Sequence, residues 1–252
     1  MISQKELTSH LQQLLSCDRF NDYTPNGLQV EGKEQIKRIC TAVTASDEVI
    51  SQAIDWKADA LLVHHGYFWR GESSVITGMK RQRLQKLLNH EINLLAYHLP
   101  LDCHLDLGNN ACLAKLFEVN SIQMHRVGGT DNLLWSGELA TVMTNKELNQ
   151  FLAGKLGRQP LMIEGHNRKV SRIAWCSGGA QDYITEAHRL GVDAYLSGEV
   201  SERTYYEAQE LGINYYACGH HATERYGIQA LGEYLSSYFD LEYVFFDSAN
   251  PV

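Results

Sequence analysis

An internal repeat without gaps is the feature that most constrains how this chain can fold. Residues 38–66 align with residues 172–200 at a constant offset of 134, and seven aligned pairs are identical, including Asp59 with Asp193. After a shorter loop, the segment that begins at Ile92 matches the segment that begins at Ile213. Predicted strands and helices stay in step along the alignment, which indicates two related α/β halves. A generic resemblance between α/β segments is the alternative.

Apolar runs alternate with helical patterns from one end of the chain to the other. Seven continuous apolar runs are predicted strands, as expected for strands covered on both faces: residues 38–45, 60–65, 93–98, 172–177, 193–198, 214–219 and 241–246. Seven stretches are predicted helices: residues 1–16, 47–56, 80–90, 145–157, 181–190, 201–211 and 222–239. This alternation predicts an α/β fold with mostly parallel or mixed sheets.

The repeat divides the expected fold into two similar lobes that face each other across a cleft. We expect lobe one to cover about residues 1–125 and lobe two about residues 126–252, and some C-terminal residues can pack on lobe one. The boundary is placed in the polar stretch 125–132, since the chain contains no linker rich in Gly, Ser or Pro. Ligands of such folds bind in the crevice beyond the carboxyl ends of the strands.

The composition excludes several classes of protein. The 252 residues are 44% apolar and 21% charged, which is typical of a soluble globular chain. The net charge of −8 disfavours an extended surface for nucleic acid or an anionic membrane. The six cysteines are scattered and form no C-x-x-C pair, as in reduced cytosolic proteins. No apolar run is long enough to span a membrane. We therefore expect a cytoplasmic protein.

Polar side chains follow three of the predicted strands. His64 and His65 end the predicted strand at 60–65, His98 ends the one at 93–98 and Asp102 follows it, and His220 and Glu224 follow the one at 214–219. Imidazoles and carboxylates together are ligands for transition-metal ions. Five or more of them are too many for one open tetrahedral zinc ion and suit two ions that share a carboxylate. The sequence therefore predicts a dinuclear metal site.

Each of these signals also has a structural interpretation. The adjacent histidines can be structural, and polar pairs at i and i+4, such as His220 and Glu224, are common on helices. His98 and Asp102 can form a loop hydrogen bond, and Asp102 can cap the helix that follows. The coincidence of all three strand ends in one repeated frame favours the metal site.

Five segments of the chain resemble the motifs of one known family. They are GLQVEG at 27–32, LLVHHGYFWRGE at 61–72, YHLPLDCHLDLGNN at 97–110, YLSGEVSE at 195–202 and ACGHHATER at 217–225. Over essentially its whole length the chain resembles the GTP cyclohydrolase 1 type 2 homologue family, also called the Nif-three-like family. It is most similar to the short bacterial YbgI-type members.

The resemblance implies a dinuclear centre in the cleft and a ring-shaped, toroidal homohexamer. Its implied metal ligands are His64, His65, Asp102, His220 and Glu224, with Glu224 as the bridge between two divalent ions such as zinc, iron or manganese. The resemblance places His221 near this site without making it a ligand.

Further residues are candidates for catalysis or for substrate binding. Glu199 occupies the repeat position of His65, so it can orient a ligand imidazole, act as a general base, or cap the helix after it. His98 is a candidate for proton transfer or substrate contact. The turn of Ser177, Gly178 and Gly179 can hold an anion or be a plain tight turn. Tyr67, with Phe68 and Trp69 beside it, can stack a base, close the cleft or pack in the core.

These expectations lead to a metal-dependent hydrolase of a small polar substrate, such as a nucleotide or a pterin precursor. The reaction of a GTP cyclohydrolase is implied by the family name only. The alternative is a ring-forming metal-binding or interaction protein that is not an enzyme, since the sequence identifies no nucleophile and no unambiguous general base. A ring around nucleic acid is disfavoured by the charge, although the basic residues at 79–83 can line a channel.

Overall fold

All but two of the strands of this protein form two mixed sheets, a five-stranded one and a six-stranded one. A computed structural model describes residues 1–252. Its contacts divide the chain into unit 1, which contains residues 1–101 and 227–249, and unit 2, which contains residues 102–226 and 250–252. The predicted α/β class is confirmed, with one mixed sheet in each unit. No helix is both long enough and apolar enough to cross a membrane.

Unit 1 contains a five-stranded sheet in the order β13-β4-β5-β6-β2, and β1 and β3 pair separately. The strands are β1 (Ile2–Ser3), β2 (Gly27–Val30), β3 (Gln35–Ile36), β4 (Arg38–Thr44), β5 (Ala60–His65), β6 (Asn93–Ala96) and β13 (Glu242–Phe245). The helices are α1 (Gln4–Leu14), η1 (Cys17–Arg19), α2 (Asp47–Asp55) and α3 (Gly78–Asn89). Helix α4 (Leu99–Asp102) and the long helix α9 (His220–Phe239) each contribute residues to both units.

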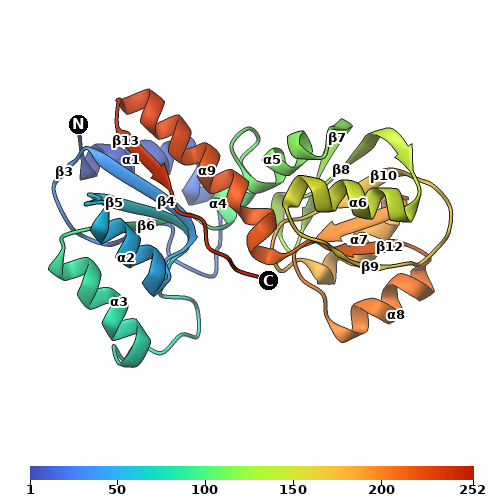
Figure 1. Cartoon of the computed structure of the whole chain (residues 1–252), viewed down its shortest axis with the longest axis horizontal. Helices are drawn as coiled ribbons and strands as arrows, with labels where there is room; N and C mark the ends of the chain where they lie inside the picture. The colour runs from blue at the N-terminus through green and yellow to red at the C-terminus, as the bar shows by residue number, and fades with distance from the viewer. The chain divides into compact units, whose positions relative to one another are not determined.

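The strands of unit 1 are covered by helices on both faces, which explains their continuous apolar sequences. Val49 and Ile50 of α2 and Leu87 of α3 pack with one set of strand residues in a single cluster. Figure 1 shows α1 and α9 along the opposite face of this sheet. Leu7 and Leu231 are fully buried on these two helices. Burial on both faces removes the alternation of polar and apolar residues that a half-exposed strand would show.

Unit 2 contains a six-stranded sheet in the order β7-β8-β10-β11-β12-β9. The strands are β7 (Val119–Val127), β8 (Thr130–Met143), β9 (Leu161–Ile163), β10 (Val170–Trp175), β11 (Ala194–Ser197) and β12 (Asn214–Ala217). The helices are α5 (Asn109–Leu116), α6 (Asn145–Leu156), η2 (Gln181–Tyr183), α7 (Ile184–Arg189) and α8 (Glu202–Leu211).

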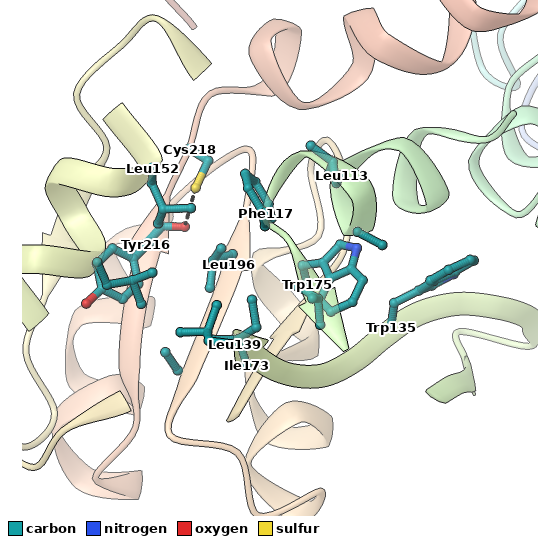
Figure 2. Packing of buried hydrophobic residues seen from close by; sticks show 14 of the residues in the cluster. Leu113, Phe117, Trp135, Leu139, Leu152, Ile173, Trp175, Leu196, Tyr216 and Cys218 are labelled. Carbon is teal, nitrogen blue, oxygen red and sulfur yellow. Dashed lines mark hydrogen bonds between the residues drawn. The ribbon is translucent and has the colours of Figure 1, made fainter. Parts of the chain in front are cut away.

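The core of unit 2 is built around aromatic and leucine side chains on one face of this sheet. Figure 2 shows Trp175 and Trp135 beside Leu113 and Phe117. The two indole rings lie 6.1 Å apart between centroids. The Trp175 Nε1–H donates to the carbonyl of Asn110 at 3.0 Å, so the buried indole keeps a hydrogen-bond partner.

The central strands of the two sheets have the same order and the same register. Ile39 pairs with Ala60 in unit 1, and Ile173 pairs with Ala194 in unit 2, so the offset of 134 applies to both partners. In the next ladder, Ala60 pairs with Asn93 and Ala194 pairs with Asn214. Each sheet also ends in an antiparallel strand, β2 in unit 1 and β9 in unit 2.

The stretch at 125–132, where the sequence places the lobe boundary, lies inside unit 2. It forms the turn of the antiparallel hairpin β7-β8, and Val127 pairs with Thr130 across it. Gly128 and Gly129 fill the turn with φ of 57° and 81°. This backbone suits glycine and is typical of a two-residue hairpin turn. The contacts instead divide the chain between Leu101 and Asp102.

Candidate metal centre

Three imidazoles lie together in unit 1. His64 and His65 end β5, and His98 follows β6. Their nearest ring nitrogens all lie within 4.8 Å of one another. His64 is fully buried, and the His98 side chain is 16% exposed. The carboxyl ends of two adjacent parallel strands therefore bring these three donors to one place, as the sequence predicts for strand ends.

The hydrogen bonds of these rings determine which nitrogen can bind a cation. His64 Nδ1 lies 2.9 Å from the carbonyl oxygen of Tyr97, and His98 Nδ1 lies 2.7 Å from Asp22 Oδ1. Both partners are acceptors only, so each Nδ1 carries the proton. In the neutral ring Nε2 then holds the lone pair that a metal ligand needs. His65 Nδ1 lies 3.1 Å from the hydroxyl of Thr44, which can donate or accept.

Unit 2 contributes a second group of donors, around the start of α9. His220 Nε2 lies 3.1 Å from Glu224 Oε2, one turn further along the helix. His220 Nδ1 lies 2.6 Å from Glu199 Oε1. Burial alone would lower the pKa of His220, but Glu224 and Glu199 outweigh burial and raise this pKa to about 9. The site therefore attracts positive charge, which a bound cation can supply instead of the second imidazole proton.

The position of Glu199 distinguishes between two of its predicted roles. Helix α8 begins with Ser201 as its N-cap, so Glu199 does not cap it. Its carboxylate accepts from the His220 imidazole, in the manner of the carboxylates that orient metal-bound histidines. This contact favours the orienting role.

Asp102 is held by neighbours from two other segments of unit 2. One carboxylate oxygen accepts from Asn109 Nδ2 at 2.9 Å and from Ser177 Oγ at 2.9 Å. The side chain is buried, and α5 has Gly108 as its N-cap, so Asp102 does not cap that helix. Both of these bonds are made by Oδ1, which fixes the orientation of the carboxylate group.

The turn at residues 177–179 lies beside the carboxylates of Asp102 and Glu224. The Ser177 N–H donates to Asn110 Oδ1 at 3.0 Å, and the Gly178 N–H donates to Thr223 Oγ1 at 3.0 Å. Both backbone N–H groups therefore already have acceptors within the protein, which favours a tight turn over an anion site. Gly178 has φ of 66°, and a Cβ there would clash with Glu224 Oε1. Glycine is therefore required for the close approach of this carboxylate.

The other substrate-binding candidates lie in different surroundings. A Cβ added to Gly179 would lie 3.5 Å from the Glu199 carboxylate, so this residue borders the unit 2 donors. Tyr67 is 6% exposed, and its hydroxyl donates to the carbonyl of Ala45 at 2.7 Å, which favours core packing. His221 is buried, and its N–H donates to the carbonyl of Val252 at 3.0 Å.

Asp22 is a residue of this centre that the sequence analysis does not identify. It lies 76 residues before His98, in a loop with no periodic pattern, and only the fold brings the two together. The sequence analysis also does not identify Asn109 and Thr223, although they lie inside the motifs at 97–110 and 217–225. Their position within those motifs is the signal that could have identified them as residues of the site.

The donor set fits divalent transition-metal ions. Imidazole nitrogens suit zinc, iron and similar ions, while buried carboxylates add the negative charge that such ions require. The orienting acceptors behind His64, His98 and His220 are the partners that metal-bound histidines normally have. The buried histidine and carboxylate clusters are thus consistent with a metal site.

A family model described as Duf34/NIF3 (NGG1p interacting factor 3) matches residues 2–251. The chain belongs to the DUF34/NIF3 family. A DUF34/NIF3 relative from Yersinia pestis, named GTP cyclohydrolase 1 type 2 homolog, is 50% identical over 247 residues, which cover 98% of each chain. A relative of the same name from Pseudomonas aeruginosa is 47% identical over 250 residues, 99% of each chain. The predicted family resemblance is confirmed.

Solved DUF34/NIF3 structures share the fold along the whole chain. One, described as protein ybgI of unknown function, is 47% identical, with a TM-score of 0.96 and full coverage of both chains. TTHA1606 from Thermus thermophilus is 31% identical, with a TM-score of 0.90 and full coverage of both chains. The α/β architecture with two mixed sheets is therefore that of the DUF34/NIF3 family.

Proposed function

We propose that this protein is a metal-dependent hydrolase of a small polar substrate. In this proposal the two halves face each other across a cleft, and both supply ligands to two divalent transition-metal ions. The proposed ligands are His64, His65, Asp102, His220 and Glu224. The observation that carries the proposal is the orientation of the rings, since His64 and His220 both direct Nδ1 to an oxygen acceptor, which makes Nε2 the nitrogen that can bind a cation.

The residues around the proposed ligands have separate roles. Glu224 is the candidate bridge, because its carboxylate lies beside His220 and offers two oxygens. Glu199 keeps the His220 ring in one orientation, and Ser177 does the same for Asp102. Two divalent ions held there would supply an activated water and would neutralise charge on the attacked atom.

The proposed substrate class is a nucleotide or a related polar heterocycle. The name of the relatives, GTP cyclohydrolase 1 type 2 homolog, supports a purine nucleotide. A name shared across homologues does not fix the reaction, because sites differ on a common fold. Phosphoesters and cyclic amides therefore belong in the same substrate screen.

Two properties of the whole protein are also proposed. One is a toroidal homohexamer, which is supported by the family resemblance and would have a mass of about 171 kDa, six times the 28.5 kDa of one chain. The other is a cytoplasmic location, which is supported by the scattered cysteines, five of them buried and none in a disulfide.

The test is metal-dependent turnover with variants of one helix. Wild-type protein purified without chelator should hold about two ions per chain, lose turnover on chelation and regain it when metal is added. Glu224→Ala should lose both the metal and the turnover. Glu233→Ala is the matched control, because Glu233 is an exposed residue on the same helix α9.

The outcomes separate the proposal from its alternative. Two ions per chain without turnover on any substrate of the screen would favour a metal-binding or interaction protein that is not an enzyme. Absence of bound metal in wild-type protein, also after reconstitution with zinc, iron and manganese, would contradict the metal-dependent hydrolase and would favour an interaction protein that is not an enzyme.

A further inference from the structure

We propose that Arg158 binds an anionic group of the substrate, a phosphate or a carboxylate, at the edge of unit 2 that carries the proposed metal ligands of this unit. The inference rests on the proposed function and deepens it, because it restricts the small polar substrate to one that carries a negative charge. Arg158 lies between α6 and β9, outside all the motifs that the sequence analysis singles out.

The first support is the position of Arg158 at the carboxyl edge of the sheet. The parallel strands β11 and β12 end at this edge, where Glu199 and His220 follow them. Strand β9 runs antiparallel to β12, and Leu161 at its start pairs with Ala217 at the end of β12. The residues just before β9 therefore lie at the same edge as the donors of unit 2. In open α/β sheets, ligands bind beyond this edge.

The second support is the contact between the Arg158 guanidinium and the residue before His220. Gly219 has φ of 99°, and a Cβ added to it would clash with Arg158 Nη1 and would lie 2.7 Å from Arg158 Cζ. Glycine at this position therefore meets two requirements, a left-handed backbone and the close approach of a cation. The guanidinium thus contacts the chain one residue before the proposed ligand His220.

The third support is a buried nitrogen of this cation that lacks an acceptor. Nη1 of Arg158 is buried and has no hydrogen-bond partner. Elsewhere in unit 2, Arg126 and Arg203 each pair with an aspartate. The C-terminal end of α6 favours a nearby cation, but the carbonyl of Leu156 there already accepts from Arg225 Nη2 at 3.0 Å. A buried N–H group without an acceptor is destabilising, so a bound anion would recover free energy that the protein alone does not.

The chemistry of a guanidinium determines the class of ligand. Arg158 is only partly buried, so the rest of its side chain is accessible to solvent. A guanidinium presents several N–H donors in one plane and forms paired hydrogen bonds with the oxygens of a phosphate or a carboxylate. It has no lone pair for a metal ion, so Arg158 would hold the substrate and not the ions. An anionic group bound to Arg158 would bring the remainder of a small substrate beside the donors of unit 2.

The experiment measures the binding of inorganic phosphate to the full-length protein by calorimetric titration, with the metal content determined on the same samples. Arg158→Gln removes the positive charge, and Arg158→Lys keeps the charge but loses the planar set of donors. Arg168→Gln is the matched control, since Arg168 is an exposed arginine of the same unit. Acetate, added in competition with phosphate, is the probe for a carboxylate.

The expected result is graded. Arg158→Gln should weaken phosphate binding by at least about 10-fold, because it removes hydrogen bonds between two charged groups. Arg158→Lys should weaken it less, and Arg168→Gln should leave it unchanged. Competition by acetate would support a carboxylate as the group that Arg158 binds, and its absence would support a phosphate.

Two results would overturn the inference. One is a folded Arg158→Gln variant that binds phosphate as tightly as wild type, and the other is wild-type protein that binds no phosphate. The metal content should be the same in wild type and in all three variants. The proposed function fails separately, because it requires bound ions that depend on Glu224, whereas the inference requires a phosphate affinity that depends on Arg158.

Discussion

At the scale of single residues, the proposed ligands are oriented by partners that lie far away in the sequence. His220 receives its orientation from Glu199, 21 residues earlier, and Asp102 from Ser177, 75 residues later. Such partners fix the tautomer of a ring or the rotamer of a carboxylate before any ion arrives. A ligand that is already oriented loses less entropy on binding, so the partners contribute to affinity without touching the ion.

Glu199 provides the first prediction at this scale. Replacing the carboxylate by an amide in Glu199→Gln weakens the hold on His220 Nδ1–H, because a neutral acceptor forms a weaker bond than a charged one. We expect metal affinity to fall by about 10–100-fold, measured by competition with a coloured chelator. Glu202→Gln is the matched control, since Glu202 is exposed at the start of α8. Equal metal affinities in the two variants would show that Glu199 does not contribute to metal binding.

The sequence shows the candidate ligands but not the residues that orient them. His64, His65 and His220 stand out because each follows a predicted strand, and the strand signal is local. Asp22 has no such signal, since its loop contains neither an apolar period nor a metal motif. Its contact with His98 exists only because the chain returns after 76 residues. Residues of this kind become visible once the tertiary structure is known.

At the scale of elements, one aspartate in each unit, buried at Asp59 and partly buried at Asp193, connects the starts of two neighbouring strands. Asp59 Oδ2 accepts from the N–H groups of Lys37 and Arg38, both at 2.9 Å. Asp193 Oδ2 accepts from the N–H groups of Ser171 at 2.9 Å and Arg172 at 3.0 Å. The identity of these aspartates in the repeat thus has a physical reason, since each satisfies the N–H groups of a strand's first residues.

Asp59 leads to a prediction on pH. Burial alone would raise the pKa of Asp59, but the Lys33 side chain and the two backbone N–H groups outweigh burial and hold this pKa below its ordinary value. The stabilisation is therefore complete above about pH 5 and is lost as the pH falls through about 3.9 toward the lower folded-state value. Asp59→Asn should lower the free energy of unfolding by about 1–3 kcal/mol at pH 7.

The measurement is urea unfolding of metal-free protein at pH 7 and at a series of pH values below about 3.9, the ordinary pKa of an aspartate. Metal-free protein is used because acid would also release bound ions. The difference in the free energy of unfolding between Asp59→Asn and wild type should become smaller at the lower pH values. Asp55→Asn serves as the control, since Asp55 is exposed at the end of α2. A difference that does not change with pH would contradict a stabilising role for the charge of Asp59.

The hairpin β7-β8 is the element that the sequence analysis misses. Most of β7 is exposed and polar, so it lacks the continuous apolar run that marks the central strands. The Gly-Gly pair at 128–129 was the available signal, because two glycines between strands are typical of a hairpin turn. The stretch is interpreted instead as a boundary, because glycine and polar residues are also typical of linkers.

Replacing glycine by alanine at two positions of unit 2 should change the stability of the protein in opposite directions. Gly129→Ala places a Cβ on a residue with φ of 81°, which should destabilise the protein by about 1 kcal/mol. Gly154 lies inside α6 with no atom within 4 Å of an added Cβ, so Gly154→Ala should stabilise it by about 0.5–1 kcal/mol. Thermal unfolding of both variants tests this, and changes of the same sign would contradict the turn assignment.

At the scale of the whole molecule, one chain contains two units whose sheets share the order of their central strands. Three chain connections join them, at residues 101–102, 226–227 and 249–250. Ions bound at the proposed centre would stabilise the native chain by a free energy that rises with the logarithm of their affinity. Ions that bind only the native state contribute about 4 kcal/mol each at a free concentration 1,000 times the dissociation constant.

The final prediction follows from where the proposed ligands lie. All five belong to one chain, so chelation should remove stability within each chain and leave the proposed hexamer assembled. We expect the melting temperature to fall on chelation and to recover with added metal, while the mass in solution stays at about 171 kDa, six times 28.5 kDa. Scanning calorimetry and light scattering on the same samples measure both quantities. A mass that drops on chelation would show that the ions link subunits, and a single-chain mass in wild-type protein would rule out the ring.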